Sequence, residues 1–532
     1  MKAVCGASPT NFSRGPLRLV DLGTGLIEIT RNDTGPAALK RQAWARPIPD
    51  EGHANTMAVE QLRVGQSLAG LLVDGVQGTS YVGANLRLHE TRGLLIEIPF
   101  DAYDETGQFT HVRNWFDSHT PPENLLFRST DGPISLFGLR WGGHSYPSGL
   151  TAGLGTIRVG EAVLNSRDGS LTDPLLVKQL RSWLDRLNQW TGLTTVSKEV
   201  TSDPDGRISR ARRYTVTVES VDAVTWQQDD ATLALETTWR SAEESDHLGR
   251  RHVIADDVVL ESSFPEPRSF EDHLVEQRKV ANLLVLLYAS QVSFRRHRLR
   301  DQRFVDRFLS GEVIDTPFVD VISGRTVRDW TLPMPDSKER PIAFLKRIGP
   351  DGLATWAANY DQWKRFVLPA ANAFGRRDVI VEETVMSTST SLEAAGQLIG
   401  VREDEETTCS RNGRPTTATH VYRCLHLLGI TWPEHIDGIE GLARAIANNY
   451  NTIKHADRGD FPDARHSILV SHINRWIVRL LALHLTGKGD DLLKDYRSSN
   501  SNELWTLRQF FDGYELGIDA QGAWHTRAPQ ER

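Results

Sequence analysis

The chain has 532 residues, which is too long for a single hydrophobic core, so two or three domains are expected. Its composition, with 39% hydrophobic and 24% charged residues, excludes a wholly disordered protein. The formal net charge of −8 excludes a protein that coats nucleic acid through bulk positive charge, so any such contact must come from a local basic patch.

Cysteine usage and the N-terminus bear on the cellular compartment. The cysteines Cys5, Cys409 and Cys424 are too few and too scattered for a disulfide framework. The first residues lack the apolar core of a signal peptide, and no apolar run approaches the length of a membrane span. We therefore expect a cytoplasmic protein that has no membrane partner.

The first half of the chain has the pattern of short β-strands separated by Gly, Pro, Asp and Asn clusters. Strands are predicted at 84–90, 93–100, 134–141, 156–164, 214–220, 231–240 and 253–262. One helix is predicted after Asp173-Pro174, because apolar residues between Leu175 and Leu187 recur at helical spacing. We expect a β-rich N-terminal domain over 1–265, similar to a sandwich or open barrel.

The composition shifts after Pro265 and Pro267, and helical periodicity dominates from there. Helices are predicted at 271–290, 351–374, 390–398, 418–428, 439–458, 466–486 and 502–516. The fold class is therefore predicted to be α+β, with an all-α C-terminal domain over 266–532. The core of its helical bundle is expected over about 350–490.

The helix predicted over 439–458 has clear ends and an unusual polar face. Asp437 is the expected N-cap, and Gly459 followed by Pro462 is expected to stop the helix. At 100° per residue, one face carries Tyr450, Asn451, Lys454, His455 and Arg458. Two cations, a histidine and an amide at a helix end suit a phosphate better than a core. The negative end of the helix dipole favours a protonated histidine, which suits general acid–base work on a phosphodiester.

The sequence Tyr450-Asn451-Thr452-Ile453-Lys454-His455 resembles the Arg-Asn-x-Ile-x-His signature of HEPN domains, helical bundles many of which are metal-independent ribonucleases. A helix with Glu393 precedes it, and an apolar helix that ends near Leu483 follows it. With the β-rich first half and the helix start at Ser269, this layout resembles the ApeA family of anti-phage proteins. The layout covers most of the chain, whereas the motif match is specific over about 390–487.

The resemblance implies roles for the residues of the signature. His455 would be the catalytic histidine, and Asn451 the polar residue that follows the family's arginine. Tyr450 stands at the position of that arginine and carries no charge near neutral pH. Lys454 and Arg458 are the candidates for supplying the missing positive charge.

Two further positions are assigned outside the signature. Glu393 is expected to support the site from the preceding helix. Arg444 lies about 16 Å down the helix axis at 1.5 Å per residue, so it is expected to bind a distant phosphate of the same RNA strand.

The resemblance implies a defence effector that needs no cofactor. Two copies would bring their signatures together in a homodimer or larger homo-oligomer and cut cellular RNA, with tRNA favoured, after attack by the ribose 2′-OH. The β-rich domain would sense a phage-derived trigger protein or restrain the nuclease. The alternative left open is a catalytically inactive HEPN-like bundle that dimerises or binds RNA or protein, with Tyr450 marking the lost activity and a β-rich recognition domain.

Two weaker signals lie elsewhere. The basic segment with Arg295, Arg296, Arg298 and Arg300 is a candidate for RNA backbone contact, or else a face paired with nearby acidic residues. Cys409, His420, Cys424 and His426 lack the paired C-x-x-C spacing of a zinc knuckle, so no metal site is predicted and buried reduced cysteines are expected.

Overall fold

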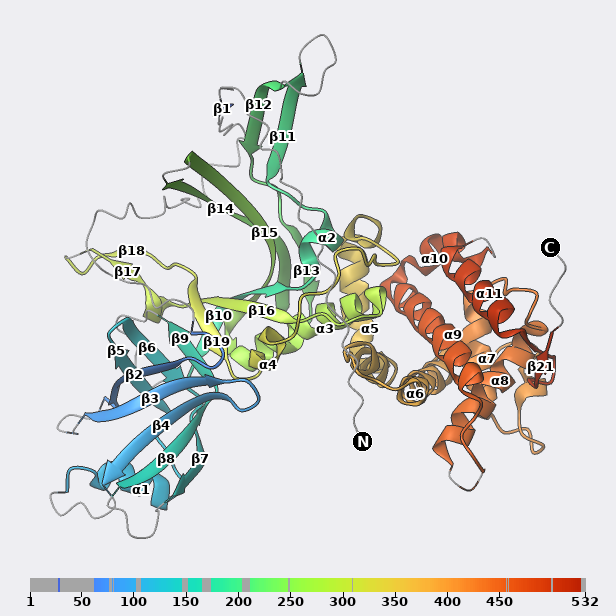
Figure 1. The fold of residues 1–532 in the computed structure, drawn as a ribbon, viewed down its shortest axis with the longest axis horizontal. Coiled ribbons are helices and arrows are strands. Elements are labelled where there is room, and N and C mark those ends of the chain that lie inside the picture. The colour runs from blue at the N-terminus through green and yellow to red at the C-terminus, as the bar shows by residue number, and fades with distance from the viewer. Residues whose placement is uncertain are drawn as a thin grey trace, which may run out of the picture. The chain divides into compact units, whose positions relative to one another are not determined.

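The computed structural model of the protein describes residues 27–28, 62–75, 79, 81–101, 107–145, 152–164, 174–202, 211–246, 249–308, 310–455, 457, 459–498 and 501–527. The fold class is α+β, as predicted: an antiparallel sheet formed within residues 67–323 precedes a helical region (Figure 1). Contacts divide the chain into two compact units, one of residues 1–47, 194–221 and 239–256 and the other of the remaining residues.

The smaller unit contains a three-stranded sheet in the order β1-β12-β11. The strands are β1 (Ile27–Glu28), β11 (Val196–Ser202) and β12 (Ala211–Val218). β11 and β12 pair antiparallel from Val196–Val218 onward, and β1 runs parallel to β12. Near this sheet, the Asp256 carboxylate accepts hydrogen bonds from the Thr194 hydroxyl at 2.7 Å and the Thr195 backbone N–H at 2.8 Å.

The main sheet runs in the order β13-β14-β15-β10-β16-β19-β9-β6-β5-β2-β3-β4-β8-β7. Its first strands in the chain are β2 (Ser67–Val73), β3 (Val82–His89), β4 (Gly93–Asp101), β5 (Asn124–Ser129), β6 (Gly132–Phe137), β7 (Arg140–Ser145), β8 (Ala152–Val159) and β9 (Glu161–Leu164). The later ones are β10 (Leu176–Leu184), β13 (Val224–Gln228), β14 (Ala231–Asp246), β15 (Gly249–Ser269), β16 (Phe294–Arg300) and β19 (Val319–Ser323). β16 and β19 lie beside β10 and β9, so the sheet continues past the domain boundary expected near residue 265.

The predicted helix after Asp173-Pro174 is wrong, because this segment forms β10 in the middle of the sheet. Leu176, Leu180 and Leu184 are four residues apart, and a spacing of four is also a multiple of the two-residue period of a strand. A register shift between Val177 and Gln179 further disturbs the simple alternation. Only α2 (Leu187–Thr191) is helical here.

Strands β2 to β6, β8, β9 and β19 enclose a second apolar core together with α1 (Thr110–Asp117). The Phe116 ring is fully buried and stacks on Phe100, with ring centroids 5.4 Å apart. Gly155 of β8 leaves the space that this ring occupies, because a Cβ at Gly155 would lie 1.9 Å from the ring atom Cζ of Phe116.

A Gly155→Ala substitution should therefore lower the free energy of unfolding by about 1–3 kcal/mol through overpacking. Urea denaturation followed by tryptophan fluorescence measures this. Gly83→Ala is the matched control: Gly83 lies in β3, and a Cβ there has no atom within 4 Å. We expect the control to be neutral, and equal losses in the two variants would contradict this packing account.

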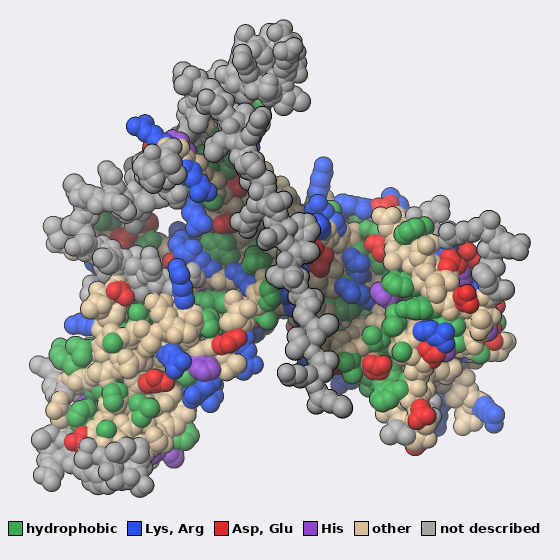
Figure 2. Space-filling model, in the orientation of Figure 1, with side chains coloured by type: hydrophobic (Ala, Val, Ile, Leu, Met, Phe, Trp, Pro, Cys, Tyr) green, Lys and Arg blue, Asp and Glu red, His purple; other side chains and the backbone are tan. Residues whose placement is uncertain are grey.

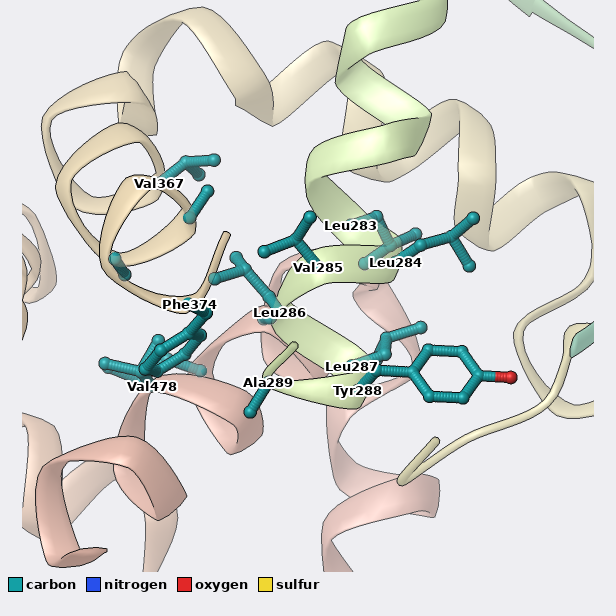
Figure 3. Packing of buried hydrophobic residues seen from close by; sticks show 14 of the residues in the cluster. Leu283, Leu284, Val285, Leu286, Leu287, Tyr288, Ala289, Val367, Phe374 and Val478 are labelled. Atoms are coloured by element: carbon teal, nitrogen blue, oxygen red, sulfur yellow. The ribbon is translucent and has the colours of Figure 1, made fainter. Parts of the chain in front are cut away.

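Helix α3 (Phe270–Tyr288) joins the sheet to the helical region. It starts at a capping box in which Ser269 and Asp272 bond each other's backbone N–H groups. The buried side chain of Gln277 donates to the Leu180 carbonyl at 3.0 Å and to Ser262. Figure 3 shows the C-terminal part of α3 packing against Val367 and Phe374 of one neighbouring helix and Val478 of another.

The helical region was largely predicted from sequence. Its helices are α4 (Val327–Trp330), α5 (Leu345–Phe374), α6 (Val381–Ile399), α7 (Thr417–Leu428), α8 (Gly438–Lys454), α9 (Ala464–Leu483), α10 (Gly489–Arg497) and α11 (Asn502–Tyr514). Shorter helical elements are η2 (Gln302–Phe304), η3 (Glu405–Thr408) and the π-helix η5 (His484–Lys488). Two further strand pairs are β17 (Asp306–Arg307) with β18 (Val313–Asp315) and β20 (Leu516–Ile518) with β21 (Trp524–Thr526).

The run Ala464–Arg497, which joins α9, η5 and α10, is long and apolar enough to cross a membrane by length and composition alone. This corrects the expectation that no apolar run approaches that length. In the structure, 67% of its most apolar window is buried inside the protein, which is the behaviour of a core helix.

Candidate functional site

The candidate site lies at the C-terminal end of α8, and the structure ends this helix earlier than predicted. Asp437 is the N-cap residue, as expected, although its side chain makes no capping bond. The helix stops at Lys454, and His455 is the C-cap residue with extended backbone (φ −112°, ψ 101°). His455 still donates its backbone N–H to the Asn451 carbonyl at 3.0 Å, so its position is tied to the last turn.

Tyr450 does not share the exposed face predicted for it. It follows Leu442 and Ile446 at intervals of four residues, so it continues their buried stripe, and only 3% of it is exposed. Its hydroxyl lies 3.5 Å from the Thr390 hydroxyl of α6. The position that the sequence comparison aligns with the arginine of the HEPN signature therefore points into the bundle.

Three residues of the signature remain at the surface. Lys454 and His455 are exposed, and Asn451 is half-buried. The Lys454 ammonium lies 5.1 Å from the centroid of the Tyr450 ring, a cation–π contact that holds the charge one residue before His455. Arg458 lies outside the described residues. The structure thus brings together one imidazole, one fixed cation and one amide at a solvent-exposed helix end.

Two buried asparagines that sequence reasoning missed connect the helices of the bundle. Asn449 of α8 donates to the Ser467 hydroxyl of α9 at 3.2 Å. Asn474 of α9 donates to the hydroxyls of Thr388 and Ser389 of α6, at 3.1 and 2.9 Å. An amide at an otherwise apolar helical position was the available signal, since buried polar groups need partners.

Glu393 and Arg444 make contacts that differ from their expected roles. The Glu393 carboxylate accepts a hydrogen bond from the Thr417 hydroxyl, at the start of α7, at 2.8 Å. The Arg444 guanidinium donates to the backbone carbonyls of Ala520 and Thr407, at 2.7 and 2.6 Å. Arg444 therefore fastens the C-terminal hairpin and η3 to α8, and a phosphate would have to compete with both carbonyls.

The basic segment of β16 is paired within the chain. Arg295 forms a two-point ion pair with the buried Asp185, with both nitrogen–oxygen distances 2.7 Å. Arg296 and Arg298 share the carboxylate of Asp320 and lie over the ring of Trp183. The Arg300 guanidinium donates to the Gln179 side chain and lies over the Phe318 ring. Three of these four arginines are therefore paired with acidic residues, and contact of the segment with RNA stays a prediction.

The cysteines in this region are reduced and are held by the fold. Cys424 is fully buried, its thiol lies 3.5 Å from the Leu392 carbonyl, and burial raises its pKa well above the ordinary range. Within the described ranges, no three His, Cys, Asp or Glu side chains come together in a way that could hold a metal ion.

A Tyr450→Phe variant separates a packing role from a chemical one. Because the ring is buried and its hydroxyl has only a long contact, we expect any RNA cleavage to change by less than about threefold, which corresponds to less than one hydrogen bond. Cleavage of labelled tRNA checks this. A loss of a hundredfold or more would instead make the Tyr450 hydroxyl part of the reacting site.

One part of the chain is similar to a known protein family. Residues 77–302 match the family model described as ApeA N-terminal domain 1. The match supports an ApeA-like protein. It runs from just before β3 to η2, so it covers most of the main sheet and α3 but ends well before α8. No curated protein and no solved structure gives a significant match to the chain.

The ApeA match bears on biological role more than on chemistry. It supports the anti-phage defence role that the sequence resemblance implied. It also follows the fold, because the matched region extends past residue 265 through β16, as the observed sheet does. The chemistry at the end of α8 has to be argued from the residues there.

Proposed function

We propose that this ApeA-like protein is an anti-phage effector whose helical region cleaves cellular RNA, with tRNA favoured, by the metal-independent route of HEPN ribonucleases. His455 is the acid–base group, Lys454 stabilises the charge on the phosphate, and Asn451 orients the phosphate or the imidazole. The proposal rests on one observation above all: the imidazole is exposed at the end of α8, beside an exposed lysine.

The reaction follows from what an imidazole can do. A neutral His455 takes the proton of a ribose 2′-OH, and the 2′ oxygen attacks the adjacent phosphorus. The bond to the 5′ oxygen of the next nucleotide breaks, and that oxygen takes up a proton. The products are a 2′,3′-cyclic phosphate and a 5′-hydroxyl. Lys454 places positive charge where negative charge builds up on the phosphate oxygens.

One imidazole cannot be the base and the acid in the same step, which gives a physical reason for a dimer. A second copy of the chain would supply the protonated His455 for the leaving 5′ oxygen. His455 lies on the surface, where an imidazole from another chain can approach it. A homodimer or larger homo-oligomer is therefore part of the proposal, and the matched N-terminal region would sense a phage-derived trigger.

The alternative function is a binding module without catalysis, and one observation favours it. Tyr450 stands where the family has its arginine, and it is buried. If Lys454 does not replace that arginine, the bundle serves to dimerise or to hold RNA or a protein.

RNA from infected cells distinguishes these functions. Cells that carry the full chain, or its His455→Ala variant, are challenged with a panel of phages, and RNA ends are mapped by sequencing. New internal cuts in cells with the wild-type chain, absent with the variant, support the nuclease. Protection from phage with intact cellular RNA in both strains would favour the binding module.

A further inference from the structure

A cationic pocket is lined by residues that the proposed nuclease does not use. It has a volume of about 570 Å³ and is lined by Arg186 between β10 and α2, the segment that follows α3, the loop before α5, the end of α5 with the start of α6, and Arg475 of α9. Four arginines line it, namely Arg186, Arg376, Arg377 and Arg475, against the two carboxylates of Asp336 and Glu339. On the visible face of the helical region, by contrast, basic and acidic side chains are interspersed (Figure 2).

Arg186 forms a fixed positive charge in the wall of this pocket. Only 2% of its side chain is exposed, and its backbone is left-handed (φ 70°), an unusual conformation for a bulky residue. The guanidinium pairs with Glu339, donates to the Ser290 hydroxyl at 3.1 Å and lies over the Tyr288 ring at 4.4 Å. Its buried Nε nevertheless has no hydrogen-bond partner. An unused buried donor is costly, and the Glu339 carboxylate is the anion that compensates the charge of this guanidinium.

Two of the other arginines lack a carboxylate of their own. In the described part of the chain, Arg377 and Arg475 form no ion pair: Arg377 donates to the Pro333 carbonyl at 2.9 Å, and Arg475 donates to the Ala289 carbonyl. Desolvation by the surrounding protein lowers the pKa of Arg475, and Glu339 partly offsets this effect. Arg376 pairs with Glu383 at the rim, where both side chains are about half exposed.

The remaining wall combines apolar and neutral polar groups. Phe374 packs in the core shown in Figure 3, with the Arg475 guanidinium 5.6 Å from its ring centroid. Met334 at the rim is 71% exposed, so its side chain is free to cover a flat ligand. Ser290 and Gln291 add hydrogen-bonding side chains. A concave site of this volume with a few convergent polar groups is typical of a small-molecule site.

We infer that this pocket binds a nucleotide that carries two or more phosphate groups. Arginine is the residue that best matches phosphate oxygens, because its planar donors bind two oxygens at once. Unpaired guanidiniums on separate segments suit a chain of phosphates better than a single anion, and the exposed methionine suits a base. The inference does not depend on RNA cleavage, because none of these residues belongs to the end of α8.

Calorimetric titration of the full chain tests the inference. ATP and GTP are the probes, with pyrophosphate and adenosine representing the two halves of the ligand, all in EDTA. We expect one of the triphosphates to bind, and adenosine to bind at least tenfold more weakly. Arg377→Gln should weaken triphosphate binding tenfold or more. Arg411→Gln, an exposed arginine before α7, is the matched control and should leave it unchanged.

Each other outcome overturns the inference. The first is that neither triphosphate binds at millimolar concentration, and the second is that Arg377→Gln binds the triphosphate as tightly as the wild type does. The third is that tRNA binds at this site and triphosphates do not displace it. His455→Ala protein should bind the triphosphate as the wild type does. Failure of the nuclease proposal is thereby distinguishable from failure of this one.

Discussion

A His455→Ala variant is expected to lose RNA cleavage by about a hundredfold to ten thousandfold, because removing a general acid–base group has effects of that size. The loss should fall on the rate of the cleavage step, with RNA affinity changed little, since one exposed imidazole contributes little to binding. Single-turnover cleavage of labelled tRNA at saturating protein measures the rate, and filter binding measures the affinity.

His426→Ala is the matched control for this variant. His426 is an exposed histidine on α7, a helix that packs beside α8, so its removal is a change of the same size in the same bundle. We expect the control to keep wild-type activity. Equal losses in the two variants would mean that the effect comes from folding and not from chemistry.

An Arg423→Met variant is expected to be destabilised by about 3–5 kcal/mol, the usual effect of removing one partner of a buried ion pair. Arg423 of α7 and Glu405 of η3 form a two-point pair with both nitrogen–oxygen distances 2.7 Å, and their side chains are 6% and 7% exposed. Arg423 also donates to the Gly396 carbonyl of α6 at 3.3 Å. Its removal leaves the buried Glu405 carboxylate without its cation and removes the hydrogen bonds that connect α7 with η3 and α6. Urea denaturation measures the loss.

The same pair predicts a pH dependence. The hydrogen bonds from Arg423, followed by that from the Arg402 backbone, hold the pKa of Glu405 below its ordinary value of 4.5. The pair therefore contributes its full stabilisation at pH values above the ordinary pKa of Glu405. This contribution is lost as the pH falls through the lowered pKa of the folded state. The difference in free energy of unfolding between the wild type and Arg423→Met should be largest near pH 7 and should decrease at acidic pH. The double variant Arg423→Met, Glu405→Met should recover much of the loss, and no recovery would contradict the ion-pair account.

Helical periodicity in the sequence was a good guide to the C-terminal half. The predicted helices at 271–290, 418–428 and 502–516 correspond to α3, α7 and α11 within a few residues. These helices carry apolar stripes, and all three begin at side-chain caps, formed by Ser269, Thr416 and Ser501. Where both signals agree, local sequence determines the element.

The spacing of apolar residues gave a wrong prediction where it fits both the helical period and the strand period. The leucines of β10 match a helix and a strand equally well, and the outcome was set by pairing with β15 and β16, which are distant in sequence. Tyr450 was placed on the polar face by its angle in a helix of 100° per residue, although its spacing of four residues from Ile446 and eight from Leu442 puts it on the buried stripe. Long-range pairing of strands is not visible in a local window.

The candidate site could be predicted from the sequence, whereas the pocket could not. Asn451, Lys454 and His455 are neighbours in sequence, so a motif finds them. Arg186, Arg377 and Arg475 come from three separate segments and converge only in the folded chain. The partners of Arg295, Arg296 and Arg298 were equally hidden, since Asp185 and Asp320 lie on other segments.

The chemistry of the RNA ends tests the central claim most directly. The full chain is purified from phage-infected cells, so that any trigger is present, and is incubated with tRNA in EDTA beside the His455→Ala protein. We predict fragments with a 2′,3′-cyclic phosphate and a 5′-hydroxyl from the wild-type protein alone. Intact tRNA, fragments with 3′-hydroxyl and 5′-phosphate ends, or the same fragments from both proteins would contradict a reaction carried by His455.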